Sequence, residues 1–279
     1  MLATRGVGIV RLMHTKSILA GHVKTEETHR LEICVAGRWM YERGLICACE
    51  GNLSVRLDDD RILTTPTCMN KGMLEPGDLV VTDLEGRQLE GERKVSSELA
   101  MHLLFYKMRP DLNAICHAHP TTATGFAVAG RGLDQALLPE VIVAFGQVPL
   151  VKYATPGTPQ LSAAIEPYVP HYDALLLANH GAVTCGPDLL TAFYRMETVE
   201  QFAKITQAAE LAGEPQLLSS REVAKLMAAR TRYFVTPPPG GGAELPLTSD
   251  SGGDDRVTLT REELEALIDE AVRKDRSRH

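Results

Sequence analysis

The sequence AICHAHP, residues 114–120, has the pattern of a short strand that ends at a proline. Side chains two positions apart on a strand point to the same face, so His117 and His119 can converge on one point. Two such histidines are either ligands of one metal ion or hydrogen-bonded residues of a half-buried strand. This spacing alone leaves both interpretations open.

A third histidine lies in a second strand-like stretch, ALLLANHGAVTC, residues 174–185. There His180 directly precedes a glycine, which permits a sharp turn. Three histidines with one open coordination position are typical of catalytic zinc sites, whereas structural sites are closed by four protein ligands. The order Glu98, His117 and His119, His180 along the chain therefore favours a metal site.

Helical and strand-like segments alternate on either side of these stretches. The residue spacing predicts helices over 25–43, 188–213 and 219–234, and short strands over 52–57, 61–65 and 78–83. The alternation predicts an α/β domain that covers residues 25–235.

Ser96, Ser97 and Glu98 are expected to open a further helix. The first amides of a helix lack intrahelical partners and carry partial positive charge, so this helix start is a natural seat for phosphate. Glu98 is either an acid that complements the helix dipole or a functional carboxylate. His102, one turn later, is either a supporting partner of the site or a surface histidine.

Composition excludes several classes of function. The chain has 279 residues, of which 44% are hydrophobic and 23% charged, as in ordinary soluble domains. A net charge of −7 argues against a broad nucleic-acid-binding surface. No apolar run approaches the roughly 20 residues that span a bilayer, so no membrane partner is expected. Six cysteines without a CxxC pair predict free thiols in a reducing, cytoplasmic compartment.

The two ends of the chain predict extensions to this domain. Residues 1–24 are basic and lack acids, so they are either a weak transit peptide or an unstructured start before Met13. Residues 236–256 contain nine Pro or Gly in 21 positions, which predicts a disordered linker.

Residues 257–279 predict an amphipathic docking helix. Thr260 and Glu263 match a capping box. A narrow apolar stripe follows at Leu264, Leu267, Ile268, Ala271 and Val272. A short amphipathic helix on a flexible tether either docks on a partner or associates with a copy of itself.

Taken together, the ordered motifs resemble the class II aldolase/adducin family, and within it the aldolases that act on L-fuculose 1-phosphate. The motifs are GNLS (51–54), TTPTC (64–68), SSE (96–98), CHAHP (116–120), KYATPGT (152–158) and NHG (179–181). The resemblance implies a three-layer α/β/α domain around a central, largely antiparallel sheet. It also implies a homotetramer with active sites between subunits.

The resemblance implies a role for individual residues. His117, His119 and His180 would bind Zn²⁺, and Glu98 would fill the fourth position at rest and act as general acid/base once substrate displaces it. Tyr233 would reach the active site from the C-terminal part of the domain. The phosphate would be surrounded by Gly51, Asn52, Thr67, Cys68, Ser96 and Ser97. From the residues alone, the GNLS and TTPTC segments are either hairpin turns or phosphate donors.

The activity implied by the resemblance is zinc-dependent cleavage of a ketose 1-phosphate, such as L-fuculose or L-rhamnulose 1-phosphate, to dihydroxyacetone phosphate and a short aldehyde such as lactaldehyde. Cys68 replaces the glycine usual in the family. No tyrosine lies between Leu133 and Lys152, where Glu140 and Phe145 are found instead, which leaves the aldehyde specificity open. Methylthioribulose-phosphate dehydratases, pentulose-phosphate epimerases and non-catalytic adducin-like binding modules are the competing interpretations; the epimerases carry Asp in place of Glu98.

The segment 257–279 resembles the encapsulation peptides that carry enzymes into bacterial microcompartments. This resemblance implies a shell protein as partner and a location inside such a compartment.

Overall fold

The computed structural model describes residues 24–233 and 235–240. The expected N-terminal extension up to residue 23, the expected linker beyond residue 240 and the expected helix at 257–279 lie outside the described residues. No helix of the described part is long and apolar enough to cross a membrane.

One sheet of eight strands organises the described chain, in the order β4-β3-β2-β1-β5-β8-β7-β6. Neighbouring strands pair antiparallel except β6 and β7, which pair parallel, so the expected, largely antiparallel sheet is confirmed. The strands are β1 (Asn52–Arg56), β2 (Arg61–Thr64), β3 (Val80–Asp83), β4 (Gln88–Glu90), β5 (Ala114–Ala118), β6 (Leu150–Val151), β7 (Ala174–Leu177) and β8 (Gly181–Gly186).

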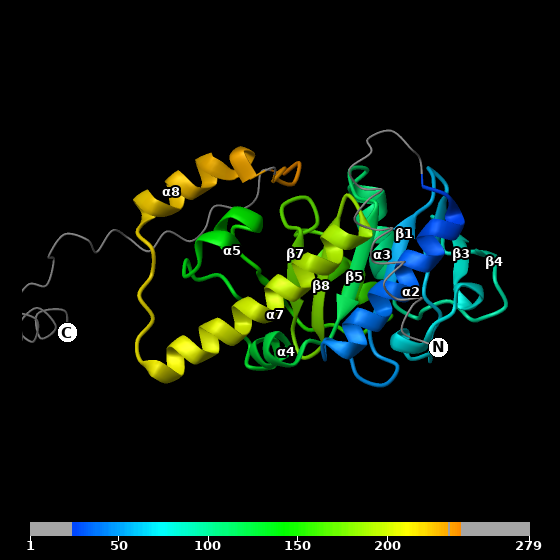
Figure 1. The fold of residues 1–279 in the computed structure, drawn as a ribbon, viewed down its shortest axis with the longest axis horizontal. Coiled ribbons are helices and arrows are strands. Elements are labelled where there is room, and N and C mark those ends of the chain that lie inside the picture. The colour runs from blue at the N-terminus through cyan, green and yellow to red at the C-terminus, as the bar shows by residue number, and fades with distance from the viewer. Residues whose placement is uncertain (1–23, 234, 241–279) are drawn as a thin grey trace, which may run out of the picture.

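Helices cover both faces of this sheet. The α-helices are α2 (Glu26–Glu42), α3 (Leu99–Met108), α4 (Thr121–Val128), α5 (Pro139–Ala144), α6 (Pro159–Ile165), α7 (Leu189–Ala212) and α8 (Ser220–Ala229). Three short 3-10 helices are η1 (Lys71–Met73), η2 (Pro76–Asp78) and η3 (Arg230–Tyr233). In Figure 1, α2 and α7 cross the near face of the sheet.

Two hydrophobic cores lie on opposite faces of the sheet. The first joins one face to side chains of α2, α4 and α7, and the second joins the other face to α3 and α6. Strand β5 shows the alternation directly, because Cys116 belongs to the first core and Ile115 to the second. His117 therefore points to the same face as α3, the helix that follows Glu98.

The stretch 174–185, expected as one strand, is a hairpin instead. Strands β7 and β8 flank a turn in which Asn179 adopts a left-handed backbone, φ 54°, which asparagine tolerates better than most residues. His180 occupies this turn, and its amide donates to the carbonyl of Leu177. The helix expected to include Glu98 begins one residue later, at Leu99, with Glu98 as its N-cap.

Candidate active site

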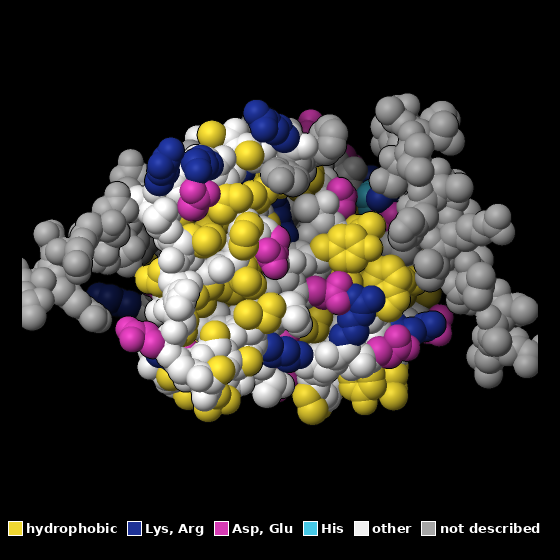
Figure 2. All heavy atoms as spheres, turned by 60° about the vertical axis from the view of Figure 1, so that its left-hand side comes forward, with side chains coloured by type: hydrophobic (Ala, Val, Ile, Leu, Met, Phe, Trp, Pro, Cys, Tyr) yellow, Lys and Arg dark blue, Asp and Glu magenta, His cyan; other side chains and the backbone are white. Residues whose placement is uncertain are grey.

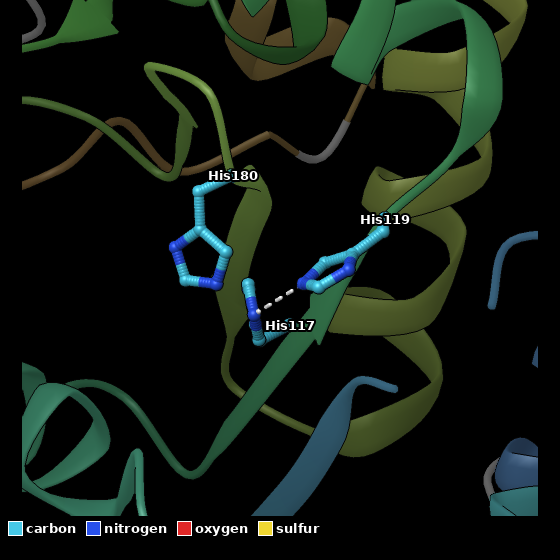
Figure 3. Close-up of side chains that lie close together, drawn as sticks. All are labelled: His117, His119 and His180. Carbon is cyan, nitrogen blue, oxygen red and sulfur yellow. Dashed lines mark hydrogen bonds between the residues drawn. The ribbon is translucent and has the colours of Figure 1, made fainter. Parts of the chain in front are cut away.

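Three imidazoles meet at the end of β5. His117 lies on β5, His119 just beyond it, and His180 in the β7–β8 turn. Their ring centroids are 4.7–5.0 Å apart, and one nitrogen from each ring lies within 4.8 Å of the others. Figure 3 shows the three rings facing a common centre. The structure thus brings together all three expected histidines.

The glycine of the Asn-His-Gly motif makes this approach possible. A Cβ on Gly181 would lie 2.5 Å from the carbonyl oxygen of Ala118 and 2.5 Å from Cδ2 of His119. Because any larger residue would collide with both, Gly181 allows β8 to begin directly against the end of β5. The motif therefore fixes the distance between His119 and His180.

The rings are oriented by different partners. Nδ1 of His117 donates to the carbonyl oxygen of Ala182 at 2.9 Å, which leaves its Nε2 free to face the centre. Nε2 of His119 lies 3.2 Å from Nε2 of His117. On the other side of the His119 ring, Nδ1 lies 3.6 Å from the carboxylate of Glu50. A carboxylate on the outer nitrogen is the usual partner of a metal-binding histidine.

Glu98 completes the cluster with a carboxylate. One oxygen lies 3.2 Å from Nε2 of His117 and the other 3.1 Å from Nε2 of His180, while the Asn52 amide donates to the first at 2.9 Å. Burial would raise the pKa of Glu98, but the contacts with His117 and His180 outweigh it and lower the pKa well below the ordinary range. Glu98 is therefore an anion held between two imidazoles.

The protonation state of His119 suits metal binding. Burial, reinforced by the neighbouring His117 and His180, lowers the pKa of His119 to about 3, although Glu98 acts in the opposite direction. A neutral imidazole offers the lone pair that a metal ion needs. Three imidazoles and one carboxylate that converge in this way match the donor set of a divalent transition metal such as zinc.

His102 is a buried residue rather than a surface histidine. Only 1% of it is exposed, and its Nδ1 shares a 2.7 Å hydrogen bond with the hydroxyl of Ser54, which also contacts the Tyr106 hydroxyl at 2.9 Å. Burial and the proximity of His117 lower the pKa of His102 to about 3. His102 thus joins α3 to β1, four residues after the Glu98 N-cap of that helix.

The residues expected to hold phosphate lie on three connected segments. Asn52 begins β1 directly after Gly51, and it pairs with His117 across the sheet. Thr67 donates its amide to the carbonyl of Lys94 at 3.0 Å, which ties the turn after β2 to the segment before α3. In that segment the Ser96 hydroxyl accepts from the amide of Glu98 at 3.3 Å, and Ser97 follows it exposed.

Cys68 adopts a backbone conformation that glycine favours. Its backbone φ is 56°, in the left-handed region that disfavours residues with a Cβ. The turn therefore has a conformation that a glycine would adopt freely, and it carries an exposed thiol. Tyr233 ends η3, and its side chain lies outside the described part of the structure.

Three residues near the site carry little signal in the sequence. Glu50 faces His119, as described above. Glu200 accepts from the first amides of α4. Lys71 is buried beneath the turns that hold Gly51 and Cys68. Each of the three makes its contact with a segment distant in the sequence, so local patterns do not predict it. Only Glu50 has a local signal, because it directly precedes Gly51 and Asn52.

The sheet, its two helical layers and the cluster of three histidines with one glutamate define a candidate metal-binding centre on an aldolase-type α/β fold. Residues 31–207 match the family model of the class II aldolase and adducin N-terminal domain. The chain belongs to this family.

Named relatives within it include enzymes of two kinds. The chain is 39% identical over 174 residues to 3-oxo-tetronate 4-phosphate decarboxylase of Haemophilus influenzae, covering 61% of this chain and 82% of that protein. It is 34% identical over 203 residues to 5-deoxy-D-ribulose 1-phosphate aldolase of Bacillus thuringiensis, covering 72% and 94%. A solved L-fuculose 1-phosphate aldolase superposes with a TM-score of 0.70 at 34% identity, covering 76% of this chain and all of that one.

Proposed function

We propose that this protein is a metal-dependent aldolase that cleaves a ketose 1-phosphate, such as L-fuculose or L-rhamnulose 1-phosphate, to dihydroxyacetone phosphate and a short aldehyde such as lactaldehyde. The observation that carries the proposal is the carboxylate of Glu98 between His117 and His180. From this position the carboxylate could be displaced from the metal by substrate oxygens, and it would remain beside the carbon that reacts. The similarity to two sugar-phosphate aldolases supports the reaction type.

His117, His119 and His180 would hold the metal, with Glu98 as the fourth ligand at rest. We propose zinc, because three imidazoles and an exchangeable fourth position are its usual catalytic ligands. The ion would supply Lewis acidity, which stabilises negative charge on the substrate's ketone and hydroxyl oxygens.

Cleavage then requires the movement of two protons. The C3–C4 bond breaks and its electron pair enters the enediolate of dihydroxyacetone phosphate, while the C4 hydroxyl loses its proton to become the aldehyde. The enediolate takes up a proton at C3. We assign both transfers to Glu98: its carboxylate, an anion at rest, would accept the proton that the C4 hydroxyl loses and would return it to C3. Asn52 holds the carboxylate in place by its hydrogen bond. Gly51, Asn52, Thr67, Cys68, Ser96 and Ser97 would bind the phosphate, and Tyr233 would lie near the aldehyde end.

A second candidate reaction is decarboxylation of a phosphorylated 3-oxo acid. The similarity to the Haemophilus influenzae decarboxylase favours it, and loss of CO₂ from such an acid leaves the same kind of enediolate. Both reactions would use the same metal ligands and the same acid/base group. They differ in the group that is lost, an aldehyde or CO₂.

The test is to offer the metal-loaded protein L-fuculose 1-phosphate and 3-oxo-tetronate 4-phosphate in parallel. Dihydroxyacetone phosphate is followed by a coupled assay, with aldehyde and CO₂ as the distinguishing co-products. We expect chelator-sensitive release of aldehyde. CO₂ alone would establish the decarboxylase. A dehydrated product by NMR would establish a dehydratase, and an epimerised one an epimerase. A folded protein that binds no metal would indicate an adducin-like module.

We also propose that the chain forms a homotetramer in the cytoplasm and that residues 257–279 dock on a microcompartment shell protein. Figure 2 shows hydrophobic side chains gathered on the face that α5 and α8 share, with few charged ones among them. A shallow pocket between α5 and α7 is lined half by apolar and half by polar residues, namely Leu138, Val141, Phe202 and Ile205 with Glu140, Glu197, Thr198 and Gln201. Apolar surface of this kind is typical of contacts between subunits.

A further inference from the structure

Lys71 is a buried cation that has no carboxylate partner in the described part of the chain. Only 2% of the residue is exposed, and its ammonium donates to the carbonyl oxygens of Cys49 at 2.7 Å and Met69 at 2.8 Å. Within residues 24–233 and 235–240, no carboxylate forms an ion pair with it. A buried charge that is unpaired costs several kcal/mol. A fold that retains an unpaired buried charge therefore indicates that an anionic ligand binds near it.

The ammonium lies beneath the two turns that the proposed phosphate site uses. Cys49 comes two residues before Gly51, and Met69 directly follows Cys68. One ammonium that bonds both carbonyls holds the two turns next to each other. Burial lowers the pKa of Lys71, and Cys49, Cys68 and Glu98 act in the opposite direction. These three groups therefore lie close enough to interact electrostatically with the Lys71 ammonium.

The surrounding fold holds this lysine rigidly. Helix α2 packs against η1, and a Cβ on Gly37 would lie 2.4 Å from the carbonyl oxygen of Lys71. Because the helix comes this close, the backbone of Lys71 is held against α2, and its ammonium is held by the carbonyl oxygens of Cys49 and Met69. Its charge is fixed before any substrate binds.

We propose that Lys71 is the charge partner of the substrate's phosphate and selects phosphorylated substrates from beneath the two turns. The inference rests on the proposed function. Gly51, Asn52, Thr67, Cys68 and the two serines offer only uncharged donors, whereas a phosphate ester carries up to two negative charges. An ammonium in the protein interior is screened little by solvent, so it attracts the phosphate across the turns without touching it. Lys71 is thus a positioning residue.

The competing explanation is a purely structural clamp between the two turns. The variants K71Q and K71M distinguish a role of the charge from a role of the hydrogen bonds. Glutamine keeps a hydrogen-bond donor without the charge, and methionine keeps neither. Metal-loaded wild type and both variants are titrated calorimetrically with dihydroxyacetone phosphate, and with dihydroxyacetone as the phosphate-free control. K107Q is the matched control, since Lys107 is half-exposed and lies on α3.

We expect both variants to bind dihydroxyacetone phosphate about tenfold or more weakly, with unchanged metal content and unchanged weak binding of dihydroxyacetone. KM for the ketose phosphate should rise more than kcat falls. Wild-type affinity in K71Q would overturn the proposal in favour of the clamp. If K71M does not fold, K71Q alone decides.

A measurement on the wild type provides an independent check. The ¹⁵N resonance of the Lys71 ammonium should have the shift of a charged group at neutral pH and should move when dihydroxyacetone phosphate binds. A neutral amine there would overturn the proposal. If the wild type neither binds dihydroxyacetone phosphate nor cleaves a phosphorylated ketose, the proposed function fails, which is a different result from tight phosphate binding that ignores Lys71.

Discussion

Glu98 occupies the N-cap of α3, but its side chain contacts two histidines instead of capping the helix. Residues at a helix N-cap usually accept a hydrogen bond from an amide of the first turn, and this stabilises the helix. The Glu98 side chain makes no such bond, because its carboxylate turns toward His117 and His180. The Ser96 hydroxyl accepts from the amide of Glu98 instead. The position has therefore been shaped by the site more than by helix stability.

Replacing Glu98 with glutamine should separate metal binding from proton transfer. E98Q keeps the size and one oxygen of the side chain, and the three imidazoles remain, so we expect metal to be retained. Turnover should fall by about 100-fold or more, the usual contribution of a general acid/base. Metal analysis and kcat on the same sample provide the test. Unchanged turnover would remove Glu98 from the proposed mechanism.

His119 offers the complementary experiment. H119A leaves only two imidazoles, and we expect the purified variant to lose its metal on dialysis and its activity with it. H171A serves as control, because His171 lies before β7 and contacts Gly240 instead of the centre. Full metal occupancy in dialysed H119A would contradict the assignment of the ligands.

Helix α7 supports the site from the opposite layer. Its Glu200, only 5% exposed, accepts from the amides of Thr122 at 3.1 Å and Ala123 at 2.9 Å. These amides belong to the first turn of α4, which follows His119 and Pro120 directly. A carboxylate at a helix start satisfies free amides and complements the dipole. Glu200 therefore holds the chain where it leaves the histidine cluster.

Removing this carboxylate should loosen the end of β5. We expect E200A to lower the free energy of unfolding by about 2 kcal/mol, since buried amides lose their partner. Metal affinity should fall by about tenfold, as is usual when a supporting contact of a ligand is lost. Thermal unfolding and competition with a zinc chelator measure the two effects, with E222A on exposed α8 as control. Wild-type metal affinity in a destabilised E200A would limit Glu200 to a structural role.

Sequence reasoning could find the parts of the molecule that depend on neighbours along the chain. His117 and His119 share one strand face, and the long periodic helices α2 and α7 were expected near their observed bounds. Contacts that join distant segments could not be found in this way. Glu200 lies 78 positions from Thr122, and nothing in its local pattern marks it. The short helices α4, α5 and α6 have too few turns for a clear period.

The chain as a whole should tolerate loss of its C-terminal segment. We expect deletion of 257–279 to leave kcat and KM unchanged, because every proposed site residue precedes it. Recruitment to a microcompartment shell should be abolished, and co-purification with assembled shells measures this. An inactive or aggregated truncation would contradict the prediction that this segment is a tethered docking helix.

Strand β5 lies between β1 and β8, and its register with both neighbours determines where His117 points. A slip of one residue would turn His117 into the opposite core. The β8 carbonyl that orients His117, that of Ala182, comes from 65 positions further along the chain. The three histidines therefore meet only after β5 has paired in register with both β1 and β8. If the cluster holds the metal as proposed, the native chain will bind the ion more tightly than a chain whose central strands have mispaired, so metal retention would report on correct strand pairing.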